Sequence, residues 1–158
     1  MPMTPETFRQ HALEVLDFWR RHAVDGQFGG FIPQLDREGR IYDDSQKHLV
    51  AAARLLYTFS QGMLLEGPPW CEEMARRAAK FLLQHFWDAQ HGGWYWSCRR
   101  DGTPAEKAKR TYGHDFAILA LAEFHRATGF ARSSSPSPLK GEGGVRVAAL
   151  PAPCQPRP

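Results

Sequence analysis

Residues 25–30 read DGQFGG, and residues 88–93 read DAQHGG. The spacing of 63 residues holds on both sides of these stretches without a gap, because three further residues, His22, Arg37 and Gly39, recur as His85, Arg100 and Gly102. Self-similarity at a fixed period of this size is typical of repeat architectures. The sequence therefore predicts two copies of one structural unit.

Each copy is expected to begin with an amphipathic helix. Thr4 is a good N-cap and Pro5 suits the first helical position. Apolar residues then follow at helical spacing, at Phe8, Ala12, Val15, Leu16 and Trp19. The second copy has the equivalent stripe at Met74, Ala78, Phe81, Leu82 and His85. These two helices are predicted to have one face against a core and one face in water.

A second helix in each copy is apolar nearly all round, over residues 49–59 and 116–124. Such a helix is typically buried on most sides. Between the two helices of each copy, residues 29–35 and 92–98 are short runs of strand type, which acid-Gly turns at 37–39 and 100–102 would close into hairpins. The pattern predicts an outer helical layer packed over an inner one.

The predicted fold class is mainly α, an α/α toroid or a curved helical array. Units of such arrays need neighbours on both sides, and about three or more are required for a continuous core. Two units would leave apolar helix faces open, so we expect self-association through these faces.

Composition separates residues 1–130 from residues 131–158. All nineteen aromatic residues lie in the first part, whereas six of the twelve prolines lie in the second. The first part carries 16 basic and 16 acidic residues, so the net charge of +3 belongs to the tail. We expect a helical domain over 1–130, ending near Gly129 as a helix C-cap, and a disordered Pro-, Gly- and Ser-rich tail unrelated to that domain.

The same composition excludes several classes of protein. A neutral domain with four scattered tail cations gives no basic patch for nucleic acid. No apolar run reaches the roughly 18 residues that a membrane span needs, and no secretory signal is visible at the N-terminus. The three cysteines have neither disulfide nor zinc spacing, which favours a reducing compartment. We expect a cytoplasmic protein without metal or other cofactor.

Several spaced blocks resemble the N-acylglucosamine 2-epimerase family, a superfamily that also holds mannose isomerases and cellobiose 2-epimerases. The blocks are GGFI at 29–32, DREG at 36–39, KHL at 47–49 with Arg54 and Phe59, GGWYW at 92–96, and YGHDFA at 112–117. The resemblance covers about residues 4–130. It implies a six-unit (α/α) barrel, of which two units of 63 residues would make about a third.

The resemblance also implies a reaction, the isomerisation or 2-epimerisation of a free sugar. A base removes the proton beside the carbonyl group, a cis-enediol forms, and the proton returns at C1 or C2. Histidine suits this exchange because its pKa lies near neutrality. The family's two proton-transfer histidines would belong to later units that this sequence lacks. No complete catalytic set is therefore expected, and the alternative function is an inactive remnant that binds sugar or associates with itself.

Three residues are the candidates for sugar binding. Arg54 is a single cation in an apolar helix, and an unpaired buried guanidinium is costly unless it serves a ligand or finds an acid. Tyr112 and His114 stand at the start of the next inner helix. The alternative for Tyr112 is a capping role with its ring in the core, and the alternative for His114 is a capping or surface position. Asp115 is the one carboxylate that a glycoside hydrolase on the same toroid would offer, although two are needed.

The remaining conspicuous residues are expected to be structural. Trp94 and Trp96 lie on one side of a strand and Tyr95 on the other, which favours core packing over sugar stacking. His22 and His85 occupy equivalent places late in the outer helices. Lys47 and Lys109 each precede an inner helix and are expected to be solvated or to sit at the helix start.

Overall fold

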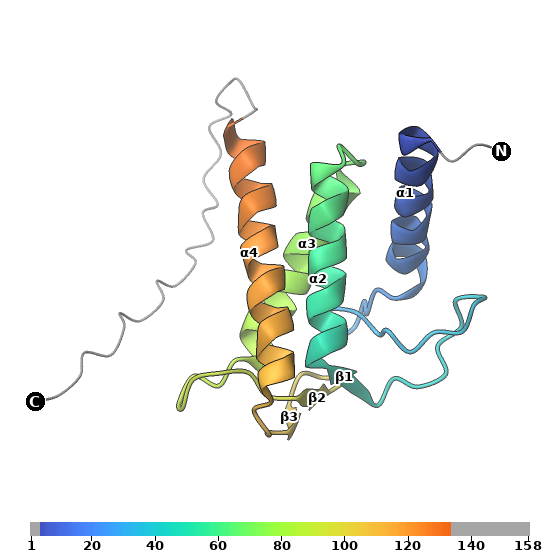
Figure 1. Ribbon diagram of the computed structural model, residues 1–158. Helices are drawn as coiled ribbons and strands as arrows, with labels where there is room; N and C mark the ends of the chain where they lie inside the picture. Colours follow the sequence, from blue (N-terminus) through green and yellow to red (C-terminus); the bar gives the residue numbers. More distant parts are fainter. Residues whose placement is uncertain (1–3, 134–158) are drawn as a thin grey trace, which may run out of the picture.

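The computed structural model describes residues 4–133, which form four α-helices, one π-helical turn and three short strands (Figure 1). The helices are α1 (Pro5–His22), α2 (Leu49–Leu64), α3 (Trp70–Phe81) with the turn η1 (Leu82–Phe86), and α4 (Thr111–Ser133). The strands are β1 (Gln46–His48), β2 (Ser97–Arg99) and β3 (Pro104–Glu106). The tail expected to be disordered lies outside the described residues, except for its first three, which continue α4.

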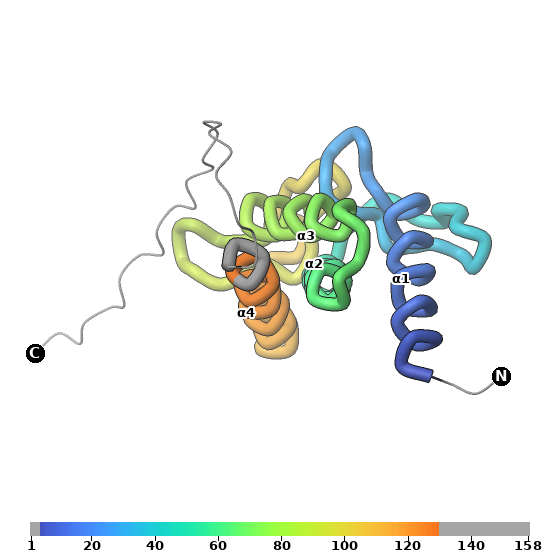
Figure 2. Tube along the Cα trace, turned by 90° about the horizontal axis from the view of Figure 1, so that it is seen from above, coloured from blue at the N-terminus to red at the C-terminus, as the bar shows by residue number. Residues whose placement is uncertain are grey.

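The helices form two pairs that run in alternating directions. Helices α1 and α3 end near the small sheet, whereas α2 and α4 begin there and run away from it (Figure 1). Seen from above, α3 lies on one side of both α2 and α4, and α1 stands apart beyond α2 (Figure 2). Helix α2 packs extensively on both α3 and α4, so it is the centre of the described structure.

The start of α1 follows from its sequence. The hydroxyl of Thr4 accepts a hydrogen bond from the backbone N–H of Thr7 at 3.2 Å, and Pro5 occupies the first turn, as predicted. The end predicted for the last helix is wrong, because α4 passes through Gly129 and continues to Ser133. A glycine inside a helix costs only about 1 kcal/mol, which the surrounding helix formers offset.

The 63-residue repeat is present in the backbone. In the first unit the N–H of Asp25 donates to Gly30 O at 3.2 Å, and in the second the N–H of Asp88 donates to Gly93 O at 2.9 Å. Isolated bridges join Val24 to Phe31 and, 63 residues on, Trp87 to Trp94. The aspartate side chains accept bonds from the N–H groups of Gln27 and Gln90, both at 3.0 Å. The repeated residues thus build the same turn twice.

The predicted hairpin is confirmed in the second unit and is reduced to a single bridge in the first. Strands β2 and β3 pair antiparallel around the turn at 100–102. In the first unit only a single bridge, Leu35 to Ile41, closes around residues 37–39. Pro33 has no N–H to give to a ladder, and the side chain of Gln34 donates to Gln46 O at 2.8 Å instead. Strand β1 then joins β2 of the second unit.

The core lies between α2, α3 and the turn that follows α3. It contains Ala53, Leu56, Phe59, Leu82 and Phe86, all completely buried. The apolar part of the stripe predicted for α3 is buried as expected, and its last member, His85, is half-buried. The stripe predicted for α1 is buried only in part, because Leu16 is buried whereas Phe8 and Val15 are exposed. Helix α4 was expected to be covered on most sides, yet Ile118 and Leu119 are also exposed. Within residues 4–133, each of these two helices has packed neighbours on one side only.

Candidate functional site

The candidate site is the end of the molecule where both inner helices begin. The first turns of α2 and α4 and the three-stranded sheet lie together there (Figure 1). Helix N-termini carry a partial positive charge and N–H groups without partners in the helix, which favours oxygen-rich ligands. The backbone N–H of Leu49 donates to Trp96 O at 3.0 Å, which ties the start of α2 to the second unit.

Arg54 and Tyr112 meet the same aromatic ring at this end. The guanidinium carbon of Arg54 lies 4.8 Å from the ring centre of Phe116, and the ring of Tyr112 packs edge-on against Phe116 at 5.0 Å. Both Arg54 and Tyr112 are exposed. The idea that Arg54 is a buried cation is therefore wrong, because α3 and α4 cover other sides of α2. Its guanidinium is nonetheless held over a ring, and among residues 4–133 its donors have no hydrogen-bond partner.

A second cation stands just before α4. The guanidinium carbon of Arg110 lies 4.5 Å from the ring centre of Trp96, and the same guanidinium pairs with Glu106 at 2.5 Å. The ring of Trp96 also lies beside Gly113, where a Cβ would be 3.3 Å from it. Trp96 therefore packs against the start of α4, as the structural prediction for this residue requires.

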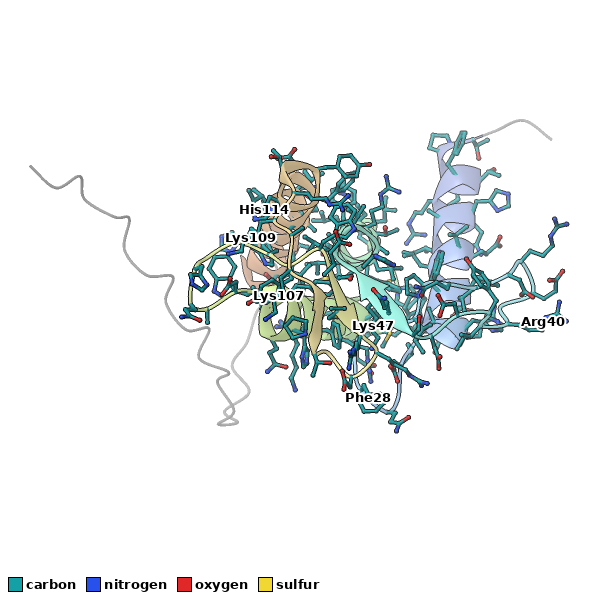
Figure 3. All side chains as sticks on the ribbon, turned by 90° about the horizontal axis from the view of Figure 1, so that it is seen from below. Phe28, Arg40, Lys47, Lys107, Lys109 and His114 are labelled. Carbon is teal, nitrogen blue, oxygen red and sulfur yellow. The ribbon has the colours of Figure 1, made fainter. Side chains whose placement is uncertain are left out.

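Both ring nitrogens of His114 form hydrogen bonds. Its Nε2 accepts a hydrogen bond from the Trp94 N–H at 3.1 Å, so the proton is on Nδ1, which donates to Arg110 O at 3.0 Å. The ring also packs against the indole of Trp94 at 5.3 Å. The structure thus places His114 against the loop of the second unit, near Lys109 (Figure 3).

A buried ion pair lies between the first unit and the sheet. The Lys47 ammonium donates to Asp25 Oδ2 at 2.9 Å and to Gly29 O at 2.7 Å, and its side chain is 2% exposed. The expectation of a solvated Lys47 is wrong, because its side chain is buried and its ammonium lies over the ring of Phe81, 4.3 Å from the ring centre. Burial lowers the pKa of Lys47, and Asp25 opposes this effect.

Asp25 is also bound from the second unit. Arg100 Nε lies 3.2 Å from Asp25 Oδ2, and the same guanidinium pairs with Asp44. Burial opposes the ionisation of Asp25, but the hydrogen bonds from Arg100 and Lys47 outweigh it and hold the pKa of this carboxyl well below its ordinary range. Sequence reasoning missed this cluster, although the recurrence of the aspartate and of the arginine at the 63-residue spacing was a signal for it.

The second unit contains the equivalent pair in a more open setting. Lys109 Nζ lies 2.7 Å from Asp88 Oδ2, and the Lys109 side chain is 32% exposed. The hydrogen bond from Lys109 lowers the pKa of Asp88. Lys47 and Lys109 thus fix the loop of their unit to the start of the following inner helix, which is the helix-start role expected for them.

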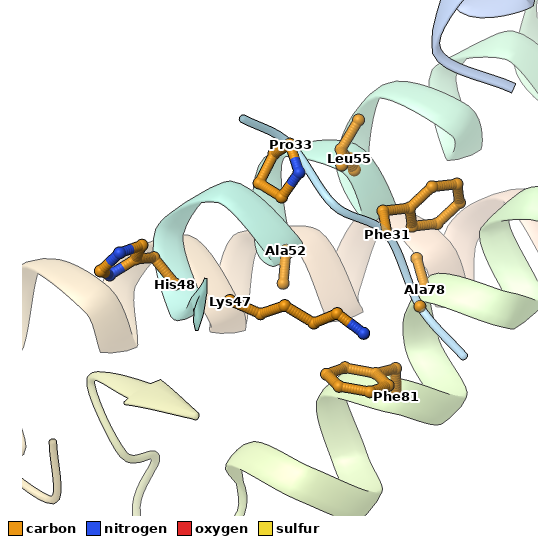
Figure 4. Close-up of a pocket in the computed structure, with 9 residues that line it drawn as sticks. Phe31, Pro33, Lys47, His48, Ala52, Leu55, Ala78 and Phe81 are labelled. Atoms are coloured by element: carbon orange, nitrogen blue, oxygen red, sulfur yellow. The ribbon is translucent and has the colours of Figure 1, made fainter. Parts of the chain in front are cut away.

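A small cavity lies beside the buried lysine. It has a volume of about 10 Å³ and is lined by Phe31, Ala52, Leu55, Phe81 and the stem of Lys47 (Figure 4). That volume is at the lower limit for one water molecule. The cavity is too small for a sugar, whereas an open groove between α1 and α2, lined by Phe8, Val15 and Gln61 among others, has a volume of about 520 Å³. The sugar-binding candidates predicted from the sequence line neither of them.

The described residues include two buried thiols and no metal cluster. Burial raises the pKa of the Cys71 thiol to about 11 and that of the Cys98 thiol to about 12, so both stay protonated near neutral pH. Within residues 4–133 no group of three or more His, Cys, Asp or Glu side chains is arranged to hold a metal ion. No helix in this part of the chain is long and apolar enough to cross a membrane.

Sequence and structure comparisons identify the class of protein. The chain is 36% identical over 124 residues to a cellobiose 2-epimerase of Bacteroides fragilis, covering 78% of this chain and 32% of that protein. It is 31% identical over 140 residues to the human N-acylglucosamine 2-epimerase, covering 80% of this chain and 30% of that protein. The class is that of sugar epimerases and isomerases.

Solved structures agree with this class. The cellobiose 2-epimerase from Spirochaeta thermophila superposes with a TM-score of 0.67 at 34% identity, over 81% of this chain and 34% of that one. A D-mannose isomerase superposes with a TM-score of 0.70 at 25% identity, over 84% of this chain and 35% of that one. The chain spans about a third of the length of these proteins.

The family is shown by its sequence profile. The profile of the N-acylglucosamine 2-epimerase family matches residues 29–134. The chain belongs to this family, and its resemblance to the family's sequence blocks is confirmed.

Proposed function

We propose that residues 4–133 form the first two units of an (α/α)6 barrel and one wall of the sugar site of a 2-epimerase or aldose–ketose isomerase. Two features support the proposal. The chain belongs to a family of such enzymes, and its inner helices begin side by side at one end of the molecule. The sugar then lies at this end, against the exposed side chains of α2 and α4.

The observation that carries the proposal is the meeting of Arg54 and Tyr112 on Phe116. An exposed guanidinium held over a ring keeps its planar set of donors in one place, which suits vicinal hydroxyls or a carbonyl oxygen. The neighbouring phenol adds a hydroxyl and an aromatic edge. In this role Arg54 binds and orients the sugar, and Tyr112 contacts it from the adjacent helix.

His114 takes part indirectly in this proposal. Both ring nitrogens already have partners, so accepting a sugar proton would break its bond with the Trp94 N–H. His114 therefore positions the loop before α4 and, through it, the start of that helix. The proton exchange through a cis-enediol needs a free base, which we assign to units of the barrel beyond residues 4–133.

It follows that the chain alone binds sugar weakly and does not catalyse the reaction. The test is a titration of the purified, isotope-labelled chain with cellobiose, N-acetylglucosamine and mannose, followed by NMR shifts. We expect millimolar binding, with shifts at the starts of α2 and α4, that Arg54→Ala weakens about tenfold.

The matched control is Arg126→Ala, which removes an exposed arginine that pairs with Glu123 farther along α4. It is expected to leave binding unchanged. Shifts spread over the whole surface, or equal effects of the two variants, would contradict the sugar site. Turnover of mannose or cellobiose by the chain alone would contradict the assignment of the proton-transfer base to other units.

A further inference from the structure

Helix α4 has an open face that its counterpart α2 does not have. The inner helices correspond at a spacing of 62, since α2 begins at Leu49 and α4 at Thr111. At this spacing Leu56, which is 0% exposed, corresponds to Ile118, which is 58% exposed. The flanking positions agree, because Ala53 and Ser60 are buried while Asp115 and Ala122 are exposed. The same helix face is covered in one unit and uncovered in the other.

The covered face of α2 shows what fits such a surface. It is the following helix pair, α3 and α4, that packs on α2. Because α4 repeats the position of α2 in its unit, the partner that fits its open face is another outer and inner helix of this same repeat. In this chain that pair exists once more, as α1 and α2.

Helix α1 has the complementary open face. At the 63-residue spacing, Phe8 and Val15 correspond to Cys71 and Ala78 in α3. Cys71 and Ala78 are 1% and 4% exposed, because α3 lies on the inner helix of the preceding unit. Phe8 and Val15 are 58% and 54% exposed. The described residues contain no inner helix that precedes α1. Helix α4 is an inner helix with an open face, so α4 of another copy can take that place.

A charged pair points to the same contact. Between the two units, Arg100 of the second reaches Asp25 of the first, with Nε 3.2 Å from Oδ2. The equivalents are Arg37 and Asp88. Arg37 is exposed and, among the residues that the structure describes, has neither an ion pair nor a side-chain hydrogen bond. Asp88 binds Lys109 but lacks the arginine that Asp25 has.

We propose that two copies of this chain associate head to tail, with the open face of α4 in one copy packed on α1 and α2 of the other. In this arrangement Arg37 of the second copy pairs with Asp88 of the first, as Arg100 pairs with Asp25 within a chain. The contact is heterologous, because it joins two different surfaces. Each pair of copies therefore still has one open α4 face and one open α1 face, to which further copies can bind.

Sedimentation of the full 158-residue chain over a range of concentrations tests the proposal. We expect a concentration-dependent shift from monomer to larger species. Ile118→Glu and Val15→Glu each place a charge on one of the two open faces, at positions exposed in the single chain, and each variant alone is expected to stay monomeric. Lys80→Glu is the matched control, since Lys80 lies on the exposed side of α3, opposite its buried stripe, and should associate as the unaltered chain does.

The decisive experiment mixes the Ile118→Glu and Val15→Glu chains. Each still has one intact face, the two intact faces are complementary, and a 1:1 pair is expected. No pair in the mixture, association of either variant alone, or an unaltered chain that stays monomeric at all concentrations would overturn the proposal. Circular dichroism of each variant confirms that it is folded.

The ion pair has a separate readout. Arg37→Glu is expected to weaken association about tenfold, whereas Lys80→Glu, with the same change in charge, leaves it unaltered. Equal effects of the two variants would show that net charge alone acts, and would overturn the role of Arg37.

Discussion

At the scale of single residues, the strongest constraint is the burial of Lys47 with Asp25. Both side chains are almost completely removed from solvent, and the ammonium and carboxylate are 2.9 Å apart. Removing one member of such a pair leaves the other as an unpaired buried charge, which is far more costly than losing an exposed pair. Asp88 and Lys109 form the equivalent pair in the second unit, where Lys109 is partly exposed. The two units therefore allow a buried and a partly exposed ion pair to be compared within one protein.

We predict that Lys47→Met lowers the free energy of unfolding by about 3 kcal/mol, because the Asp25 carboxylate loses one of its two cationic partners. Lys109→Met should cost about 1 kcal/mol, since the Lys109 side chain is one-third exposed. Urea unfolding followed by circular dichroism measures both. Adding Asp25→Asn to Lys47→Met should cost less than the sum of the two single changes. Equal losses for the two lysines would contradict this account.

At the scale of elements, each unit packs a histidine near the end of its outer helix against a turn glycine. Gly39 has a φ of +83° and Gly102 a φ of +92°, so both lie in the left-handed region. A Cβ at either position would run into the ring of His22 or of His85, respectively. The repeated His and Gly thus join the end of a helix to the turn that follows it, and this explains why both recur at the same spacing.

We predict that Gly102→Ala costs about 2 kcal/mol more than Gly92→Ala. Both glycines have positive φ, but a Cβ at Gly92 meets nothing within 4 Å, whereas one at Gly102 meets the His85 ring. The difference in unfolding free energy between the two variants therefore reports the clash with the His85 ring and not the backbone strain, which both variants share. Thermal or urea unfolding gives the values. In a His85→Ala background the two changes should cost the same, and an undiminished difference there would exclude the ring as the cause.

At the scale of the whole molecule, packing is uneven. Helix α2 is covered by α3 and α4, whereas α1 makes much lighter contact with α2 and stands to one side (Figure 2). A segment with few buried apolar contacts opens locally at lower free energy than the rest of the structure. The two open faces therefore lie on α1, which has the lightest packing, and on α4, which is the last helix that the structure describes.

Hydrogen exchange should reveal this order. In dilute solution the amides of α1 should exchange at least about tenfold faster than those of α2. At concentrations where the chain associates, α1 should become better protected while α2 changes little. Equal protection of α1 and α2 at low concentration would show that α1 packs more firmly than its exposed side chains indicate.

The sequence alone was sufficient for the repeat, the alternation of outer and inner helices, and the family. Two pairs of residues recur at a fixed spacing, Asp25 with Asp88 and His22 with His85. Each pair makes the same local turn or packing contact in both units, and contacts between residues close in the sequence leave a pattern that the sequence itself shows. The start of α1 at Thr4 and Pro5 was predictable for the same reason, since a helix cap depends on neighbours in sequence.

The partners of those residues were decided only by the tertiary structure. Strand β1 joins the second unit and buries Lys47, Arg100 reaches across 75 residues to Asp25, and Arg54 lies over Phe116 in open water and not inside a core. Helical periodicity tells which residues share a face, but it does not tell whether another helix arrives to cover that face. Phe8 and Ile118 are apolar residues on such faces, and their exposure depends on neighbours that periodicity in one chain does not supply.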